Sequence, residues 1–187
     1  MCRTVVFALV GLGILMAVLI LYLGAHGKLS GGLESLASKI PYLTWSDDWG
    51  NGRGGTWAFS WRMFMDMGFG HKLLGVGPDG YAPYAYSFYQ ERLTQLWGER
   101  TLTNAHNEWL NAVVNYGLLG GISYLGIFIS SIVSCGRKAK QMPELIMIMV
   151  CVVAYMSHNL FCYQQVLCTP FIIIIMAIGQ YLIKKGK

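Results

Sequence analysis

The amino-acid sequence predicts an all-α integral membrane protein with four transmembrane helices and one large extracytoplasmic loop that contains short amphipathic helices. Three observations predict this class. Of the 187 residues, 55% are apolar and only 12% are charged, against about 25% charged in a typical soluble domain. The apolar residues form long runs, and the basic residues outside the loop stand at the ends of those runs. Because basic residues flank membrane helices on the cytoplasmic side, the basic ends of these runs are expected in the cytoplasm. Basic charge that gathers at helix ends also argues against nucleic acid as a partner.

The first expected membrane span is an unbroken apolar run over residues 5–23, within a first segment at 1–24. A helix needs about 20 apolar residues to cross the hydrocarbon core of a bilayer. The weaker alternative is a secretory signal, whose apolar core has only about 7 to 15 residues. Cleavage after Ala25 would leave the later topology unchanged.

The segment 25–107 is expected to form the extracytoplasmic loop domain, because it is polar and rich in glycine and aromatic residues. Five of the six tryptophans of the chain lie in it. Amphipathic rings between two membrane spans suit anchoring in the headgroup layer, and they also suit sugar binding. Composition does not separate these two uses. The glycine-containing stretch 75–80 predicts a turn and lacks the nucleotide-binding pattern.

Within this domain, residues 47–55 are expected to form a loop because of their glycine content, and residues 56–67 a short amphipathic helix. Thr56 is a suitable N-cap for that helix. An apolar face at helical spacing is expected from Trp57, Trp61, Phe64 and Met65. Arg62 and Asp66 are spaced as an i, i+4 ion pair on another face.

The segment 108–187 is expected to hold three more membrane helices, over residues 109–134, 143–161 and 166–183. A basic cytoplasmic turn at 135–141 joins the first two of these helices. Both chain termini are therefore expected in the cytoplasm. The helix expected over 109–134 begins with a stripe of asparagines at i+4 spacing, Asn107, Asn111 and Asn115. Their side chains should face protein or water instead of lipid.

A cluster of polar side chains stands where the loop domain meets the helix that follows it. His106, Asn107 and Glu108 are consecutive there. One interpretation is a solvated helix start capped by Asn104, and the other is a binding or catalytic site at the helix N-terminus. His158 is expected at the same membrane depth as His106, as a functional residue or as a helix-to-helix hydrogen-bonding residue.

The order and spacing of these motifs resemble the O-antigen ligase and polymerase family of membrane glycosyltransferases. The resemblance rests on Gly52-Arg53 followed by Trp57, on residues 67–78, on Ala105-His106-Asn107-Glu108 and on residues 116–120. It implies the C-terminal part of a fold of the GT-C type. It also implies transfer of a glycan from a polyprenyl-diphosphate-linked donor to a lipopolysaccharide core, a growing polysaccharide or another glycan acceptor.

The resemblance implies catalytic roles for Arg53, as a contact to the donor diphosphate, and for His106, as a base or a second diphosphate contact. A fixed guanidinium stabilises charge on a departing diphosphate, and a group with a pKa near neutrality activates an acceptor hydroxyl. No cofactor and no metal are expected. The further residues expected to contact substrate are Asn107, Glu108, Arg62, Trp57 and His158.

Members of this family usually have about a dozen spans, whereas this chain predicts four. The sequence is therefore expected to represent a C-terminal portion, one part of a split enzyme or a degenerate copy, with a missing N-terminal half or a partner membrane subunit as its expected partner. The expected location is the outer face of the cytoplasmic membrane, with the lipid bilayer as surroundings. The alternative function is a non-catalytic membrane subunit that binds a glycan or protein partner through its aromatic outer loop.

Overall fold

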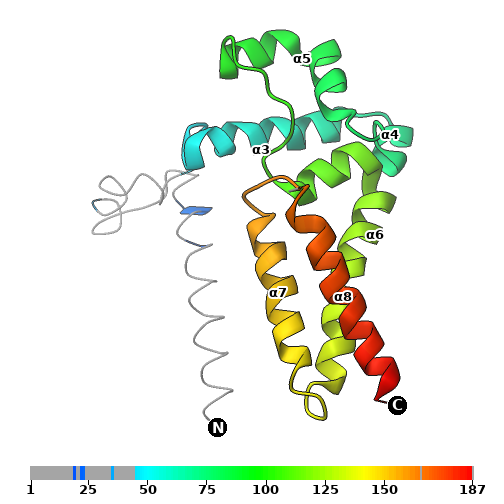
Figure 1. Ribbon diagram of the computed structural model, residues 1–187. Coiled ribbons are helices and arrows are strands. Elements are labelled where there is room, and N and C mark those ends of the chain that lie inside the picture. The colour runs from blue at the N-terminus through cyan, green and yellow to red at the C-terminus, as the bar shows by residue number, and fades with distance from the viewer. Residues whose placement is uncertain (1–18, 20–21, 24–34, 36–44, 165, 187) are drawn as a thin grey trace. The chain divides into compact units, whose positions relative to one another are not determined.

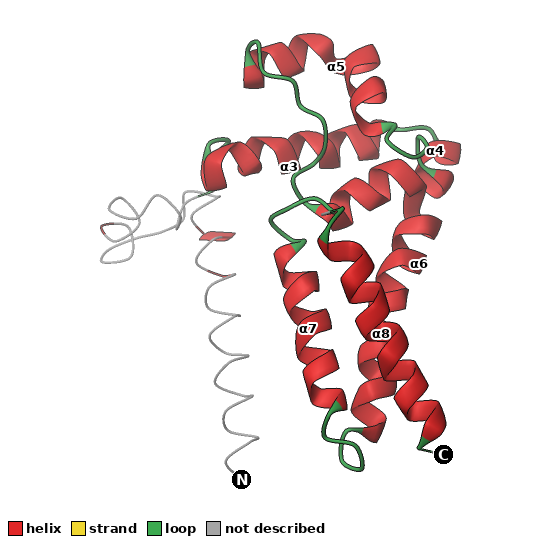
Figure 2. Ribbon diagram, in the orientation of Figure 1, coloured by secondary structure: helices red, strands yellow, loops and turns green. Residues whose placement is uncertain are grey.

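The computed structural model describes residues 19, 22–23, 35, 45–164 and 166–186. These residues form helices joined by turns and loops, with no strand among them (Figures 1 and 2). The all-helical class is thus confirmed for the described part. The chain divides into two compact units, Met1–Ala58 and Phe59–Lys187. The first expected span, over residues 5–23, lies outside the described residues except for positions 19, 22 and 23.

Six helices are described. They are α3 (Trp49–Asp66), α4 (Phe69–Leu74), α5 (Tyr81–Trp97), α6 (Glu108–Lys138), α7 (Leu145–His158) and α8 (Cys168–Lys185). The stretch 75–80 is the connection between α4 and α5, as its glycine content predicts.

The beginning of α3 differs from the expectation of a loop over 47–55. Three residues in the left-handed region, Gly50, Asn51 and Gly52, with φ of 61°, 63° and 82°, interrupt the helix just after Trp49. Regular helix resumes after them. Thr56 is therefore not an N-cap: it is buried inside the helix, and its hydroxyl donates to the Gly52 carbonyl at 2.9 Å.

An apolar cluster in the second unit joins the end of α3 to α5. The apolar face predicted for α3 is partly wrong, because Phe64 is buried in this cluster whereas Trp61 and Met65 are about half exposed. The expected Arg62–Asp66 pairing is replaced by a long bond from the Tyr89 hydroxyl to the Asp66 carboxylate, 3.4 Å. The buried members of the cluster are Phe59, Met63, Phe64, Met67, Tyr81, Ala85, Leu93, Leu102, Ala105 and Val114.

A second apolar cluster holds α6, α7 and α8 together. Its buried residues include Phe128 of α6, Val152 of α7 and Met176 of α8. The outward faces of these helices are also apolar, with Ile122, Met147 and Phe171 more than half exposed. Helices that are apolar both inside and outside the bundle are typical of a bilayer environment.

Two of these helices, α6 and α8, are long and apolar enough to cross a membrane. The third expected span is shorter than predicted, because α7 covers 14 residues instead of the whole stretch 143–161. At 1.5 Å per residue, such a helix is about 21 Å long, less than the hydrocarbon core of about 30 Å. The four-span arrangement therefore remains a prediction.

A sharp bend divides α6 at Gly117, whose φ of 69° and ψ of −175° are not helical (Figure 1). The turn after α4 lies against this bend. The Val76 N–H donates to the Val114 carbonyl at 3.1 Å, and the Gly77 N–H donates to the Asn115 carbonyl at 2.9 Å. Gly117 itself lies against the backbone of Leu73 and Leu74 at the end of α4.

Only glycine fits on either side of this crossing. A Cβ atom on Gly117 would overlap the Leu73 carbonyl, and a Cβ atom on Gly75 would overlap the Asn115 carbonyl. Both residues also have positive φ, 69° and 79°, which side chains other than hydrogen strongly disfavour. The two glycines therefore fix where the first third of α6 lies relative to α4.

Candidate active site at the start of α6

Local hydrogen bonds decide where α6 begins. The Asn107 side chain accepts from the Leu110 N–H at 3.0 Å, so Asn107 is the N-cap and Glu108 is the first helical residue. The alternative that Asn104 caps the helix is wrong. The Asn104 side chain instead accepts from the His106 N–H at 2.9 Å, which closes a tight turn in which His106 has a φ of 49°.

Glu108 is held by the connection between α7 and α8. Its backbone N–H is shared between the carbonyls of Asn159, at 2.8 Å, and Cys162, at 3.0 Å. Its carboxylate accepts from the Gln164 N–H at 2.8 Å, and only 3% of the residue is exposed. Of the two interpretations, the solvated helix start is therefore wrong for Glu108.

The two histidines predicted at one level lie at the same end of the bundle. His158 is the last residue of α7 and is exposed, with its Nδ1 3.4 Å from the side-chain oxygen of Asn159. His106 is half-buried, and its ring centroid lies 6.1 Å from that of Tyr163 in a T-shaped contact. Their proposed roles in substrate binding and catalysis remain predictions.

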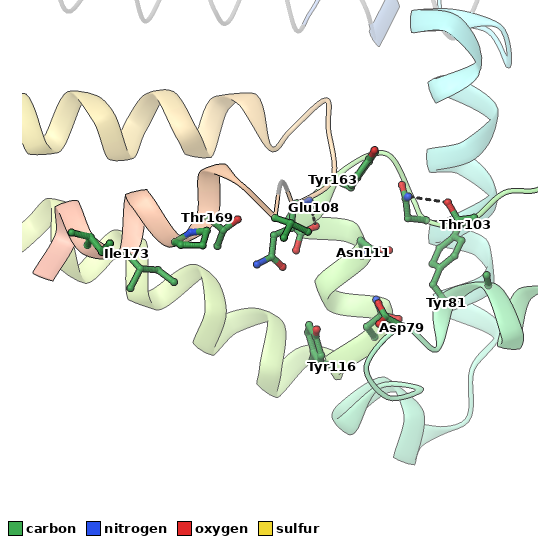
Figure 3. Close-up of a pocket in the computed structure, with 16 residues that line it drawn as sticks. Asp79, Tyr81, Thr103, Glu108, Asn111, Tyr116, Tyr163, Thr169 and Ile173 are labelled. Carbon is green, nitrogen blue, oxygen red and sulfur yellow. Dashed lines mark hydrogen bonds between the residues drawn. The ribbon is translucent and has the colours of Figure 1, made fainter.

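A cavity of about 1020 Å³ opens beside Glu108 (Figure 3). The start of α6, the start of α8, the start of α5 and the loops before α6 and α8 all contribute to its wall. Its lining residues are Asp79, Tyr81, Ala82, Thr103, Asn104, Glu108, Asn111, Asn115, Tyr116, Tyr163, Gln164, Val166, Thr169, Pro170, Ile173 and Ile174.

The cavity has two chemically different walls. Carboxylates, side-chain amides and hydroxyls come from the loops and from α6, whereas the α8 side is largely apolar, with Val166, Ile173 and Ile174 more than half exposed. Asn115 is 4% exposed, and its side-chain oxygen is buried without a hydrogen-bond partner among the described residues. A buried acceptor of this kind is costly unless a ligand or water supplies a donor.

The sequence-predicted site residues fall into separate groups. Glu108 lines the cavity, and His106 and Asn107 directly precede it. Arg62 is exposed on α3 and is not among the described residues that line the cavity. Arg53 and Trp57 belong to the first unit.

The predicted diphosphate-binding arginine has a defined local environment in the first unit. The Arg53 guanidinium donates to the Gly50 carbonyl at 2.6 Å. Three tryptophans that are near Arg53 in the sequence pack against one another. The Trp45 and Trp49 rings are stacked with centroids 5.0 Å apart, and the ring centroid of Trp57 lies 5.7 Å from that of Trp49. The left-handed glycine turn thus holds the arginine side chain back against the backbone of α3.

Several cavity residues were not predicted from the sequence as site residues. Asp79, Tyr163 and Gln164 lie in the connections before α5 and before α8, to which no role had been assigned. The asparagine stripe was the available signal, because Asn111 and Asn115 both line the cavity. Among the described residues, no three histidine, cysteine, aspartate or glutamate side chains stand close enough together to hold a metal ion.

Long apolar helices with apolar outer faces, and a cavity of about 1020 Å³ with one polar and one apolar wall at one end of the bundle, are the features of an integral membrane protein. Residues 2–125, more than half of the chain, match the O-antigen ligase family. The chain belongs to this family, as its motifs predicted. No individual curated protein and no solved structure matches it.

Proposed function

We propose that this protein transfers a glycan from a polyprenyl-diphosphate-linked donor to a glycan or lipid-linked acceptor at the outer face of the cytoplasmic membrane. Membership of the O-antigen ligase family supports glycan transfer in general. The observation that carries the proposal is the cavity beside Glu108, immediately after His106 and Asn107, at one end of an apolar helix bundle. A glycan acceptor at a membrane surface needs such a place, where polar groups meet an apolar wall.

Arg53 contacts the donor diphosphate, whose negative charge grows as the glycan leaves, and a guanidinium is well suited to bind it. His106 acts on the reacting groups, as a base or as a second contact to the diphosphate. Asn107, Glu108, Arg62, Trp57 and His158 are proposed to contact the substrates.

The test is transfer in proteoliposomes that contain the purified chain, an undecaprenyl-diphosphate-linked oligosaccharide and a delipidated or lipid-bound acceptor. Arg53→Ala and His106→Ala should each lower the rate by about 100-fold or more, the usual size of such electrostatic and acid–base contributions. Arg100→Ala, which removes an exposed guanidinium after α5, serves as the matched control. Full transfer by both site variants would contradict the proposed roles.

The second candidate function is a non-catalytic subunit that binds a glycan or a protein through its outer aromatic residues. Trp61, Phe69 and Phe88 favour it, because all three are more than half exposed. In that case the Arg53 and His106 variants would change the amount of assembled complex and leave turnover unaltered.

The proposed topology has four spans, with both termini in the cytoplasm and the segment 25–107 outside. Reporter fusions after residue 90 and after residue 140 test it. An outward reporter at 140, in the basic turn, would contradict the arrangement.

A further inference from the structure

The cavity beside Glu108 has a charge that does not suit a diphosphate. Two carboxylates, Asp79 and Glu108, line it, and no lysine, arginine or histidine is among its described lining residues. Diphosphates are bound by cations and by clusters of N–H donors, and a wall with two carboxylates repels them. The cavity therefore suits an uncharged ligand.

The same wall suits a ligand rich in hydroxyl groups. Carboxylate and amide oxygens accept hydrogen bonds from hydroxyls, and amide N–H groups donate to them. Asn115 also lines the cavity, and its buried side-chain oxygen has no hydrogen-bond partner among the described residues, which leaves an amide acceptor beside the space. Tyrosine rings at the rim, Tyr116 and Tyr163, are 41% and 46% exposed and offer flat surfaces to the apolar faces of sugar rings. Figure 3 shows both tyrosines around the same space as Glu108 and Asn111.

Glu108 is the best-positioned carboxylate in this cavity. Its place is fixed twice, by the bonds of its backbone N–H to the carbonyls of Asn159 and Cys162 and by the bond from Gln164 to its carboxylate. That last bond uses one of the two carboxylate oxygens, and a carboxylate can accept about four hydrogen bonds. A fixed carboxylate at the wall of a cavity of about 1020 Å³ is a candidate general base for a hydroxyl that binds there.

We propose that this cavity binds an uncharged acceptor saccharide and that Glu108 is the catalytic base that receives the proton of its attacking hydroxyl. The inference rests on the proposed function. In the reaction, the acceptor O–H bond breaks and its proton passes to the Glu108 carboxylate. The acceptor oxygen bonds to the anomeric carbon of the donor, and the bond from that carbon to the diphosphate oxygen breaks. The polyprenyl diphosphate leaves with the bonding electron pair.

This assignment leaves His106 to the donor side of the reaction. His106 is not among the described residues that line the cavity, although Asn104 and Glu108 on either side of it are. Of the two roles considered for His106, the assignment selects contact with the departing diphosphate.

Substitution of Glu108 by glutamine separates its chemistry from its structural role. The amide oxygen of glutamine can still accept from the Gln164 N–H, so the α7–α8 connection should keep its place, but the amide is not a base. We expect Glu108→Gln to lower the transfer rate by about 100- to 10,000-fold, with unchanged protease sensitivity of residues 159–164. Glu91→Gln, in an exposed carboxylate on α5, is the matched control and should retain full activity. Added formate should partly restore transfer by Glu108→Ala, which a purely structural role would not allow.

Binding is measured separately, by saturation-transfer NMR on the purified chain in nanodiscs. The probes are a panel of neutral hexose and hexosamine oligosaccharides, their uronic-acid counterparts and inorganic pyrophosphate. Neutral oligosaccharides should bind, and Asn115→Leu should weaken their binding at least tenfold, while pyrophosphate should not compete. Competition by pyrophosphate, or equal binding of the acidic sugars, would overturn the assignment of the cavity.

The outcomes of these experiments distinguish a failure of this inference from a failure of the proposed function. Wild-type transfer with an equally active Glu108→Gln variant would overturn the base assignment and leave the proposed function standing. Absence of transfer by the wild type would overturn the proposed function. In that case, the binding measurements still decide whether the cavity is a saccharide site.

Discussion

Substitution of Gly117 by alanine tests the crossing between α6 and the turn after α4. Gly117 has a φ of 69°, and a Cβ atom there would overlap the Leu73 carbonyl. The backbone must therefore move. That movement would break the bonds from Val76 N–H to Val114 and from Gly77 N–H to Asn115, which are 3.1 and 2.9 Å long.

The expected cost follows from these two effects. A non-glycine residue in such a backbone conformation costs about 1–3 kcal/mol. Each of the two hydrogen bonds contributes about 0.5–1.5 kcal/mol. Together they predict that Gly117→Ala lowers the free energy of unfolding by about 2–6 kcal/mol.

The assay is unfolding of the purified protein in mixed micelles as the fraction of denaturing detergent increases, followed by circular dichroism. Gly126→Ala, in the same helix, is the matched control because a Cβ atom there meets nothing within 4 Å. It should be neutral, or stabilising by about 0.5–1 kcal/mol, since alanine favours helix over glycine. If Gly117→Ala unfolds at the same detergent fraction as Gly126→Ala, the reasoning about the crossing is refuted.

Two further predictions concern local stability. Asn107→Ala removes the N-cap bond to the Leu110 N–H and should cost about 1 kcal/mol in the same unfolding assay, whereas Asn107→Asp should keep most of it. Burial raises the pKa of Tyr81 well above its ordinary value of 10.0, against a smaller lowering by its hydrogen bond with Ser60. The unfolded chain then releases this proton first, so the stability from Tyr81 is complete below pH 10.0 and declines as the pH rises further. Tyr81→Phe should reduce that decline, and an unchanged pH dependence would contradict it.

The sequence predicted those features that depend on composition and short-range patterns. Long apolar runs gave the helical bundle, and the family resemblance followed from motifs that the comparison with O-antigen ligases confirms. The polar stripe also predicted that Asn111 and Asn115 would face protein or water instead of lipid, and both line the cavity. Helical periodicity is enough for such statements, because it fixes which residues share a face.

Long-range contacts were not predictable in the same way. Glu108 read as a solvated helix start because its partners at Asn159, Cys162 and Gln164 lie about fifty residues away. Phe64 was placed on one apolar face with Trp61 and Met65, because the cluster with α5 residues that buries Phe64 alone of these three could not be foreseen. The end of α7 at His158 depends on a turn that apolar composition alone does not reveal.

The bend at Gly117 also affects which part of α6 has to enter a lipid bilayer. Residues 118–138 form the part of α6 beyond the bend. They are about 31 Å long at 1.5 Å per residue, close to the thickness of a hydrocarbon core. These residues are therefore long enough to cross the hydrocarbon core without the part of α6 before the bend. Glu108 and the asparagines at 111 and 115 lie on the other side of the bend, so their polar side chains need not be transferred into lipid. A single glycine thereby joins a stretch long enough to cross a membrane to an acidic, amide-rich end.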